Sequence, residues 1–175
     1  MELRIAGIVK ESIVDGPGIR YTVFVQGCPH GCPGCHNPYT HSFNGGTIMT
    51  TQEIFDDIKR NPLLDGVTFS GGEPFCQAKA LSELADMVHS IGLNVITYTG
   101  WTFEYLYEKY KYQRYGVSLF LDWYELLNKT DILIDGPFME LYKSYDTPFR
   151  GSSNQRILDC KESVMLEKAV IKELS

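Results

Sequence analysis

The chain has 175 residues, of which 43% are hydrophobic and 22% charged, a composition typical of one globular domain with a sizeable core. Its formal net charge is −6, which argues against nucleic-acid binding, because phosphate contacts need clustered Lys and Arg. No apolar run approaches the length of a membrane span, and five cysteines without a secretion signal favour a reducing cytoplasm.

Short apolar runs alternate with amphipathic patterns along the chain. The first two runs flank a Pro-Gly turn at 15–20, and Thr51 is the expected N-cap of the first helix. Strands are expected at 5–9, 21–26, 67–69, 94–98, 132–134 and 155–158. Further helices are expected at 81–91, 103–110 and 118–128, with Gly92 ending the first of these and Gly116 separating the other two. Residues 161–174 fit helix, strand or one of each.

Repeated strand–helix units imply a mostly parallel α/β sheet. A closed (β/α)8 barrel needs about 250 residues, so we expect an open, partial (β/α) barrel in a single domain over 1–175. In such sheets the chemistry lies beyond the carboxyl ends of the strands. Four expected strands end at polar groups or glycines: the cysteines after Gln26, Gly-Gly-Glu after Ser70, Thr99 after Tyr98, and Asp135 after Ile134.

The cysteine segment CPHGCPGCHN carries the most informative spacing, C-x3-C-x2-C at Cys28, Cys32 and Cys35. A cluster of four irons normally takes four cysteines, so three leave one iron open to a small molecule. Glycines and prolines between them would let the backbone wrap around a bulky cluster. The alternative from spacing alone is zinc, with His30, His36 or His41 as a fourth ligand.

The segment SGGEP at 70–74 follows an apolar strand. Glycine at 71 and 72 would let a ligand approach main-chain carbonyls closely. The carboxylate of Glu73 could accept a hydrogen bond from a ligand ammonium.

Together these motifs resemble the radical S-adenosylmethionine (SAM) superfamily, and the chain is similar to one subgroup, the activating proteins of anaerobic (class III) ribonucleoside-triphosphate reductase. The resemblance covers about 5–158, nearly the whole chain. One departure is Gly34, where many superfamily members carry an aromatic residue before the third cysteine. The segments that carry the subgroup resemblance are DGPGIR, FVQGCPHGCPGCHN, YTGW, LIDGPF and FRGSSNQRIL.

The resemblance implies a radical SAM type of barrel and a 4Fe-4S cluster held by Cys28, Cys32 and Cys35, with SAM on the fourth iron. It implies that Gly71, Gly72 and Glu73 hold the SAM ammonium. It further implies adenine contacts from Gly34, Cys35, His36 and Asn37, and ribose or carboxylate contacts from Thr97, Thr99, Asp135 and Arg156.

In enzymes of this type a reduced flavodoxin or similar donor supplies an electron, and SAM cleavage creates a glycyl radical on the reductase. No general acid or base is needed, and the sequence shows no persuasive His–carboxylate pair. We expect Cys76 and Cys160 to be buried free thiols, His89 to lie at the surface, and Trp101 and Trp123 to serve packing.

Three rival interpretations remain open. The nearest is an activase of another glycyl radical enzyme, such as pyruvate formate-lyase, which the GSSNQR segment and the short chain disfavour. A small-molecule radical SAM enzyme is disfavoured by the lack of an evident substrate domain. A zinc-bound interaction module without catalysis is the alternative of a different class.

Overall fold

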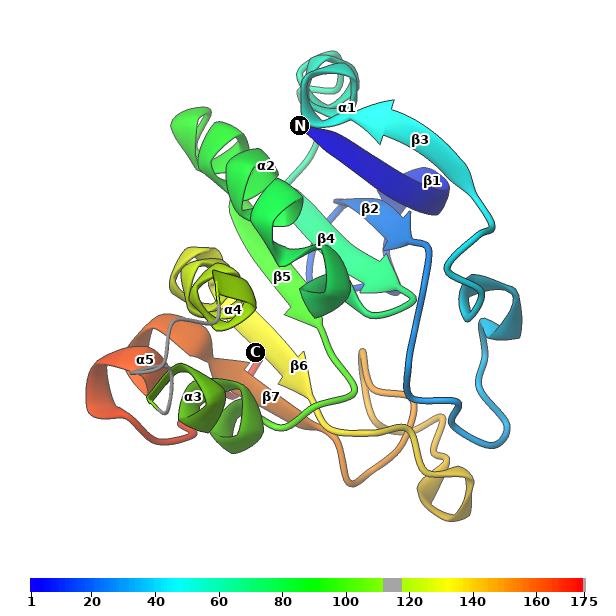
Figure 1. Cartoon of the computed structure of the whole chain (residues 1–175), viewed down its shortest axis with the longest axis vertical. Helices are drawn as coiled ribbons and strands as arrows, with labels where there is room; N and C mark the ends of the chain where they lie inside the picture. Colours follow the sequence, from blue (N-terminus) through cyan, green and yellow to red (C-terminus); the bar gives the residue numbers. More distant parts are fainter. Residues whose placement is uncertain (112–117, 175) are drawn as a thin grey trace.

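A computed structural model describes residues 1–111 and 118–174 (Figure 1). Gly116, expected between two helices, lies outside the described residues. The strands are β1 (Glu2–Ser12), β2 (Arg20–Val25), β3 (Thr47–Thr50), β4 (Gly66–Gly71), β5 (Asn94–Tyr98), β6 (Ile132–Asp135) and β7 (Arg156–Asp159). The helices are α1 (Thr51–Ile58), α2 (Ala78–Ser90), α3 (Phe103–Lys111), α4 (Ser118–Lys129) and α5 (Cys160–Leu166).

The seven strands form one sheet in the order β3-β1-β2-β4-β5-β6-β7. The central strands β2, β4, β5 and β6 are parallel neighbours, whereas β1, β3 and β7 pair antiparallel at the two sides. The predicted fold class, an open α/β sheet of partial-barrel type, is confirmed. The sequence interpretation missed β3, and it did not foresee the antiparallel flanks.

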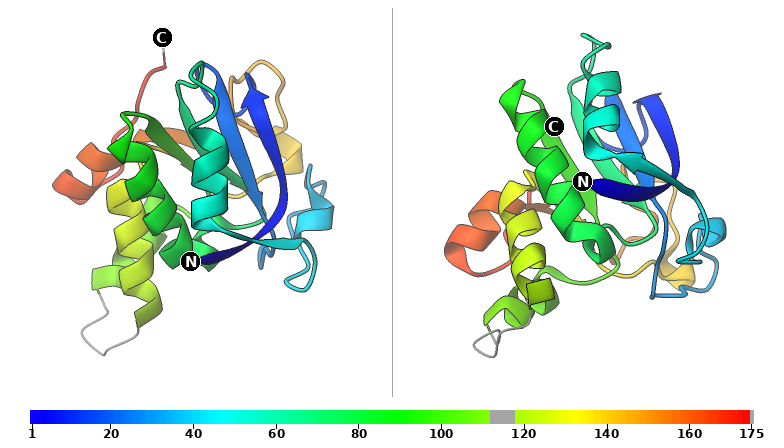
Figure 2. Two further views of the ribbon diagram at one scale, coloured as in Figure 1. Left: turned by 90° about the horizontal axis from the view of Figure 1, so that it is seen from above. Right: turned by 45° about the horizontal axis from the view of Figure 1, so that its top comes forward.

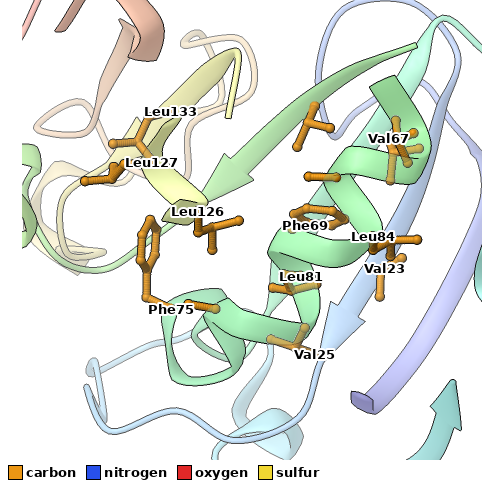
Figure 3. Packing of buried hydrophobic residues seen from close by; sticks show 14 of the residues in the cluster. Val23, Val25, Val67, Phe69, Phe75, Leu81, Leu84, Leu126, Leu127 and Leu133 are labelled. Atoms are coloured by element: carbon orange, nitrogen blue, oxygen red, sulfur yellow. The ribbon is translucent and has the colours of Figure 1, made fainter. Parts of the chain in front are cut away.

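The helices lie along one face of the sheet, with α2 and α4 side by side over its centre (Figures 1 and 2). Strand residues such as Val23 and Phe69 meet helix residues such as Leu81, Leu84 and Leu126 in one apolar cluster (Figure 3). All five side chains have no solvent exposure. This layer fixes the sheet, so the loops at the strand ends are built on a rigid support.

Helix α1 begins one residue earlier than expected, because Thr50 and not Thr51 is its N-cap. The Thr50 hydroxyl accepts a hydrogen bond from the Glu53 N–H, and the Glu53 carboxylate accepts one from the Thr50 N–H. This is a capping box. The ambiguous segment 161–174 resolves into α5, ended by Glu167 in the left-handed region (φ 55°), followed by a bridge between Ile171 and Leu158.

At the amino ends of the parallel strands, the guanidinium of Arg20 is fully buried. It donates hydrogen bonds to the Thr68 hydroxyl (3.1 Å), the Val67 carbonyl (2.7 Å) and the Asn94 side chain (2.6 Å). Burial lowers the pKa of Arg20 to about 10. A Cβ at Gly66 would lie 2.3 Å from the guanidinium, so this glycine makes room for the arginine. Three strands are thereby joined at the end opposite the loops described next.

None of the described helices combines the length and apolar character that crossing a membrane would require.

Candidate functional site

A cavity of about 500 Å³ lies at the carboxyl ends of the parallel strands. Its walls come from the loops after β2, β4, β5 and β6 and from the segment 138–155. In Figure 1 the cysteine loop and this segment lie beside each other at the lower right. The four strand ends singled out in the sequence therefore do converge on one place, because parallel strands end at the same edge of a sheet.

The three cysteines of the motif all line this cavity, and each is half-buried. The loop turns through left-handed backbone at Gly31 (φ 58°) and Gly34 (φ 71°), which glycine adopts without strain. The Asn37 N–H donates to the Cys35 sulfur at 3.4 Å. Burial raises the pKa of the Cys28 thiol to about 11, so thiolate ligation at neutral pH requires a cation to replace the proton.

These features fit an iron–sulfur cluster. Half-buried thiols around a cavity, with an amide N–H already directed at one sulfur, are the environment that tunes such clusters. Within 1–111 and 118–174, no three His, Cys, Asp or Glu side chains are grouped as ligands of one metal ion.

The two glycines at the end of β4, Gly71 and Gly72, have a packing role that the sequence did not reveal. Gly71 has φ 96°, and a Cβ there would lie 2.5 Å from the Val25 nitrogen. A Cβ at Gly72 would lie 2.3 Å from the carbonyl oxygen of Gly27. Both residues line the cavity. Their lack of a side chain is already required by the approach of β4 to β2 and to the cysteine loop.

Glu73 lies behind the cavity wall and has no solvent exposure. Its carboxylate accepts hydrogen bonds from the Phe75 N–H (3.1 Å), the Gly100 N–H (2.9 Å), the Thr99 hydroxyl (3.1 Å) and His30 Nε2 (2.6 Å). The geometry does not support the predicted direct contact between Glu73 and a ligand ammonium, because the carboxylate is already satisfied by the protein.

The expectation that the chain lacks a His–carboxylate pair is wrong. His30 pairs with Glu73, and His89 pairs with Asp131 at 2.8 Å. His89 is half-buried and not a surface residue as expected. Both pairs were missed because their partners are more than 40 residues apart in the sequence and meet only through the sheet.

Some of the other predicted site residues line the cavity, and the rest lie outside its lining. His36, Asn37 and Thr99 line it, and the His36 ring packs against Phe138 at 4.9 Å between centroids. Gly34 provides a turn of the cysteine loop and is not part of the lining.

Three predicted contacts fall outside the lining. Thr97 is buried and shares a hydrogen bond with the Thr130 hydroxyl. Asp135 is buried and accepts hydrogen bonds from the Phe103 N–H and from Arg156. Their polar groups connect the sheet to neighbouring helices, so this geometry does not support ligand contacts by Thr97, Asp135 or Arg156.

The sequence interpretation overlooked the wall formed by 138–155. Lys143, Tyr145 and Arg150 line the cavity there. Neither Lys143 nor Arg150 has a carboxylate partner within the part of the chain that the structure describes. The sequence shows both cations, but it does not show that they face a cavity.

The remaining cysteines differ in their surroundings. Cys160 is fully buried, as expected, and its thiol donates to the Leu127 carbonyl. Cys76 is only half-buried, and burial raises its pKa to about 12. Trp123 packs against Phe75 and Trp101, in agreement with the expected packing role.

Comparison with known proteins gives a family and several relatives. The family described as "4Fe-4S single cluster domain" matches residues 14–158. The anaerobic ribonucleoside-triphosphate reductase-activating protein of Escherichia coli is 30% identical over 152 residues, which cover 82% of this chain and 90% of that protein. The pyruvate formate-lyase-activating enzyme of Listeria monocytogenes is 41% identical over 96 residues.

The two relatives are covered to different extents. The match to the Listeria enzyme covers 52% of this chain and only 39% of that enzyme, so this chain aligns with about two fifths of it. Among solved structures, QueE from Escherichia coli is similar with a TM-score of 0.46 and 20% identity, over 57% of this chain and 53% of that one.

Proposed function

Since the chain belongs to the 4Fe-4S single cluster domain family and is similar to an activating protein, we propose that it cleaves SAM at a 4Fe-4S cluster and generates a glycyl radical on a protein partner. The observation that carries the proposal is the placement of Cys28, Cys32 and Cys35 around one cavity, together with the Gly71-Gly72 strand end.

Within this proposal the chain's own residues bind and orient. Cys28, Cys32 and Cys35 would hold the cluster, and when bound the reduced cluster supplies the electron that splits the SAM sulfonium. The main chain at Gly71 and Gly72 would receive the methionyl group, and His36 and Asn37, which line the cavity, would meet the adenine. Closure of the cavity by a bound partner would limit the access of water to a reactive radical.

The surface around the cavity favours a protein as the hydrogen donor. Val14 and Tyr145 both line the cavity, yet they are 71% and 89% exposed. Leu141, on the same segment as Tyr145, is 91% exposed. Exposed apolar side chains beside a site are typical of surfaces that bind another protein.

We propose anaerobic ribonucleoside-triphosphate reductase as the partner, with a reduced flavodoxin or similar electron donor. The similarity to the Escherichia coli activating protein supports this choice, since it extends over 90% of that protein. Pyruvate formate-lyase is the second candidate, because the identity to its activating enzyme is higher over a shorter region. A cytoplasmic setting remains a prediction.

An anaerobic activation assay tests the proposal. The reconstituted protein, SAM and a chemical reductant are mixed separately with each candidate partner, and electron paramagnetic resonance is recorded. We expect a doublet with the reductase, absent when its radical glycine is replaced by alanine. A doublet only with pyruvate formate-lyase would reassign the partner. Rapid SAM-dependent turnover of a small molecule, with no doublet in either mixture, would contradict the activase function.

A further inference from the structure

We infer that His30 is a positioning residue that fixes the cysteine loop to the sheet through the buried carboxylate of Glu73. The inference rests on the proposed function, because it concerns the loop that would hold the cluster. It differs from the role expected from sequence, in which Glu73 contacts the ligand. Here Glu73 acts on the loop from behind the cavity wall.

The cysteine loop is attached to the rest of the described chain through His30. Residues 29–36 connect by hydrogen bonds to the rest of the described chain at one point, the contact of His30 Nε2 with the Glu73 carboxylate. The other hydrogen bonds of this segment stay within the loop, from Cys35 to Cys32 and from Asn37 to Cys35. The anchor therefore lies between two of the three cysteines, Cys28 and Cys32.

The buried Glu73 carboxylate depends on hydrogen-bond donors from several segments. The Phe75 and Gly100 N–H groups can only donate, so Glu73 acts as an acceptor toward them. His30 Nε2 lies 2.6 Å from Oε2 of this carboxylate, the oxygen that also accepts from the Thr99 hydroxyl and the Gly100 N–H. A buried carboxylate is tolerated only where donors satisfy it, so loss of the imidazole leaves a costly deficit.

The His30 imidazole fits into a space bounded by Gly100 and Trp101. A Cβ at Gly100 would lie 2.6 Å from the His30 ring, so only glycine leaves room for it there. The His30 ring also contacts the Trp101 ring, edge-on at 4.7 Å between centroids. Trp101 packs in turn on Trp123, which is buried. The histidine side chain is only 15% exposed.

Together these contacts connect three strand ends. Glu73 follows β4, Thr99 and Gly100 follow β5, and His30 belongs to the loop after β2. A displacement of the His30 ring would change the spacing of the flanking thiols. Residues that orient metal ligands in this way typically affect metal affinity 10- to 100-fold.

The test measures iron release to a chelator from anaerobically reconstituted protein. We expect His30→Ala to release iron about 10- to 100-fold faster than the wild type. His30→Gln keeps an N–H donor near the Nε2 position, so it should release iron within about threefold of the wild-type rate. In a Glu73→Gln background, the additional change His30→Ala should have little further effect, because the pair acts as a unit.

His89→Ala is the matched control, since it removes a second His–carboxylate pair of similar length on α2. It should lower Tm without accelerating iron release. A second readout needs no cluster: amide hydrogen exchange of residues 28–36 in the metal-free protein should be faster in His30→Ala and unchanged in His89→Ala.

If His30→Ala and His89→Ala accelerated iron release equally, His30 would contribute only to general stability, and the inference would be overturned. Iron release from His30→Ala at the wild-type rate would also overturn the inference, while the proposed function would stand. A wild-type protein that takes up no 4Fe-4S cluster would instead contradict the proposed function, and the inference with it.

Discussion

Replacing Gly72 by alanine should strain the junction between β4 and the cysteine loop. The added Cβ would lie 2.3 Å from the Gly27 carbonyl oxygen, so this carbonyl must retreat by at least 0.7 Å to reach 3.0 Å, the shortest separation that real Cβ atoms show. The same carbonyl accepts the Glu73 N–H at 2.8 Å. A retreat of this size moves that hydrogen bond toward 3.5 Å, where it contributes little.

The expected cost follows from two effects. Overpacking in a closed region costs about 1–3 kcal/mol, and a weakened buried hydrogen bond adds about 1 kcal/mol. A loss of about 2–4 kcal/mol in a chain of this size corresponds to a fall of about 4–16 °C in Tm. Because Gly27 precedes Cys28, we also expect the variant to retain less iron after reconstitution.

Circular dichroism melts of the metal-free protein measure the first effect, and iron analysis the second. Gly7→Ala is the control, since a Cβ at Gly7 meets nothing within 4 Å and Gly7 has no positive φ. Its Tm should stay within about 2 °C of the wild type. A Gly72→Ala variant that melts with the wild type and retains its iron would refute the packing argument and restore the view that Gly72 only leaves space for a ligand.

Three further outcomes are expected. Cys28→Ala, Cys32→Ala or Cys35→Ala should each abolish the iron–sulfur absorbance, whereas Cys160→Ala and Cys76→Ala should retain it; loss in Cys76→Ala would add a ligand to the set. Tyr145→Ser should weaken radical transfer to the protein partner while slow SAM cleavage without partner continues; an equal loss of both would place Tyr145 in the SAM site instead. Lys172 lowers the pKa of Asp159, and Arg156 lowers the pKa of Glu104. The stability that these two carboxylates contribute is therefore present above their unfolded pKa values of 3.8 and 4.5, and it is lost as the pH falls below them. Tm should therefore drop below about pH 4 and drop less in Asp159→Asn; a Tm independent of pH in this range would contradict the assignment.

The parts of the fold that were predictable are those where local pattern decides the structure. Strand β5 was expected with the bounds that the structure shows, because its apolar β-branched residues are flanked by a turn on each side. Strand β3 was missed because it has only four residues and lies at the edge of the sheet, where none of its side chains is buried. Its position in the sheet depends on pairing with β1, which the local sequence does not predict.

The site was predictable where function depends on spacing and less so where it depends on assembly. The cysteines were singled out by their spacing, and all three line the cavity, while their role as cluster ligands stays a prediction. The structural roles of Glu73 and Asp135 were missed, because each carboxylate is satisfied by partners from distant segments. The sequence identifies a carboxylate after a strand, but it does not show whether that carboxylate faces a ligand or the protein interior.

The buried Arg20 at the other end of the sheet has a practical consequence for protein engineering. It connects the starts of β2, β4 and β5, while the cavity is built from loops at their carboxyl ends. A combinatorial library that diversifies 138–151 to change partner choice would leave the hydrogen bonds of Arg20 unchanged. The same library should hold Arg20, Gly66 and Asn94 constant, because any volume change among them displaces three strands at once.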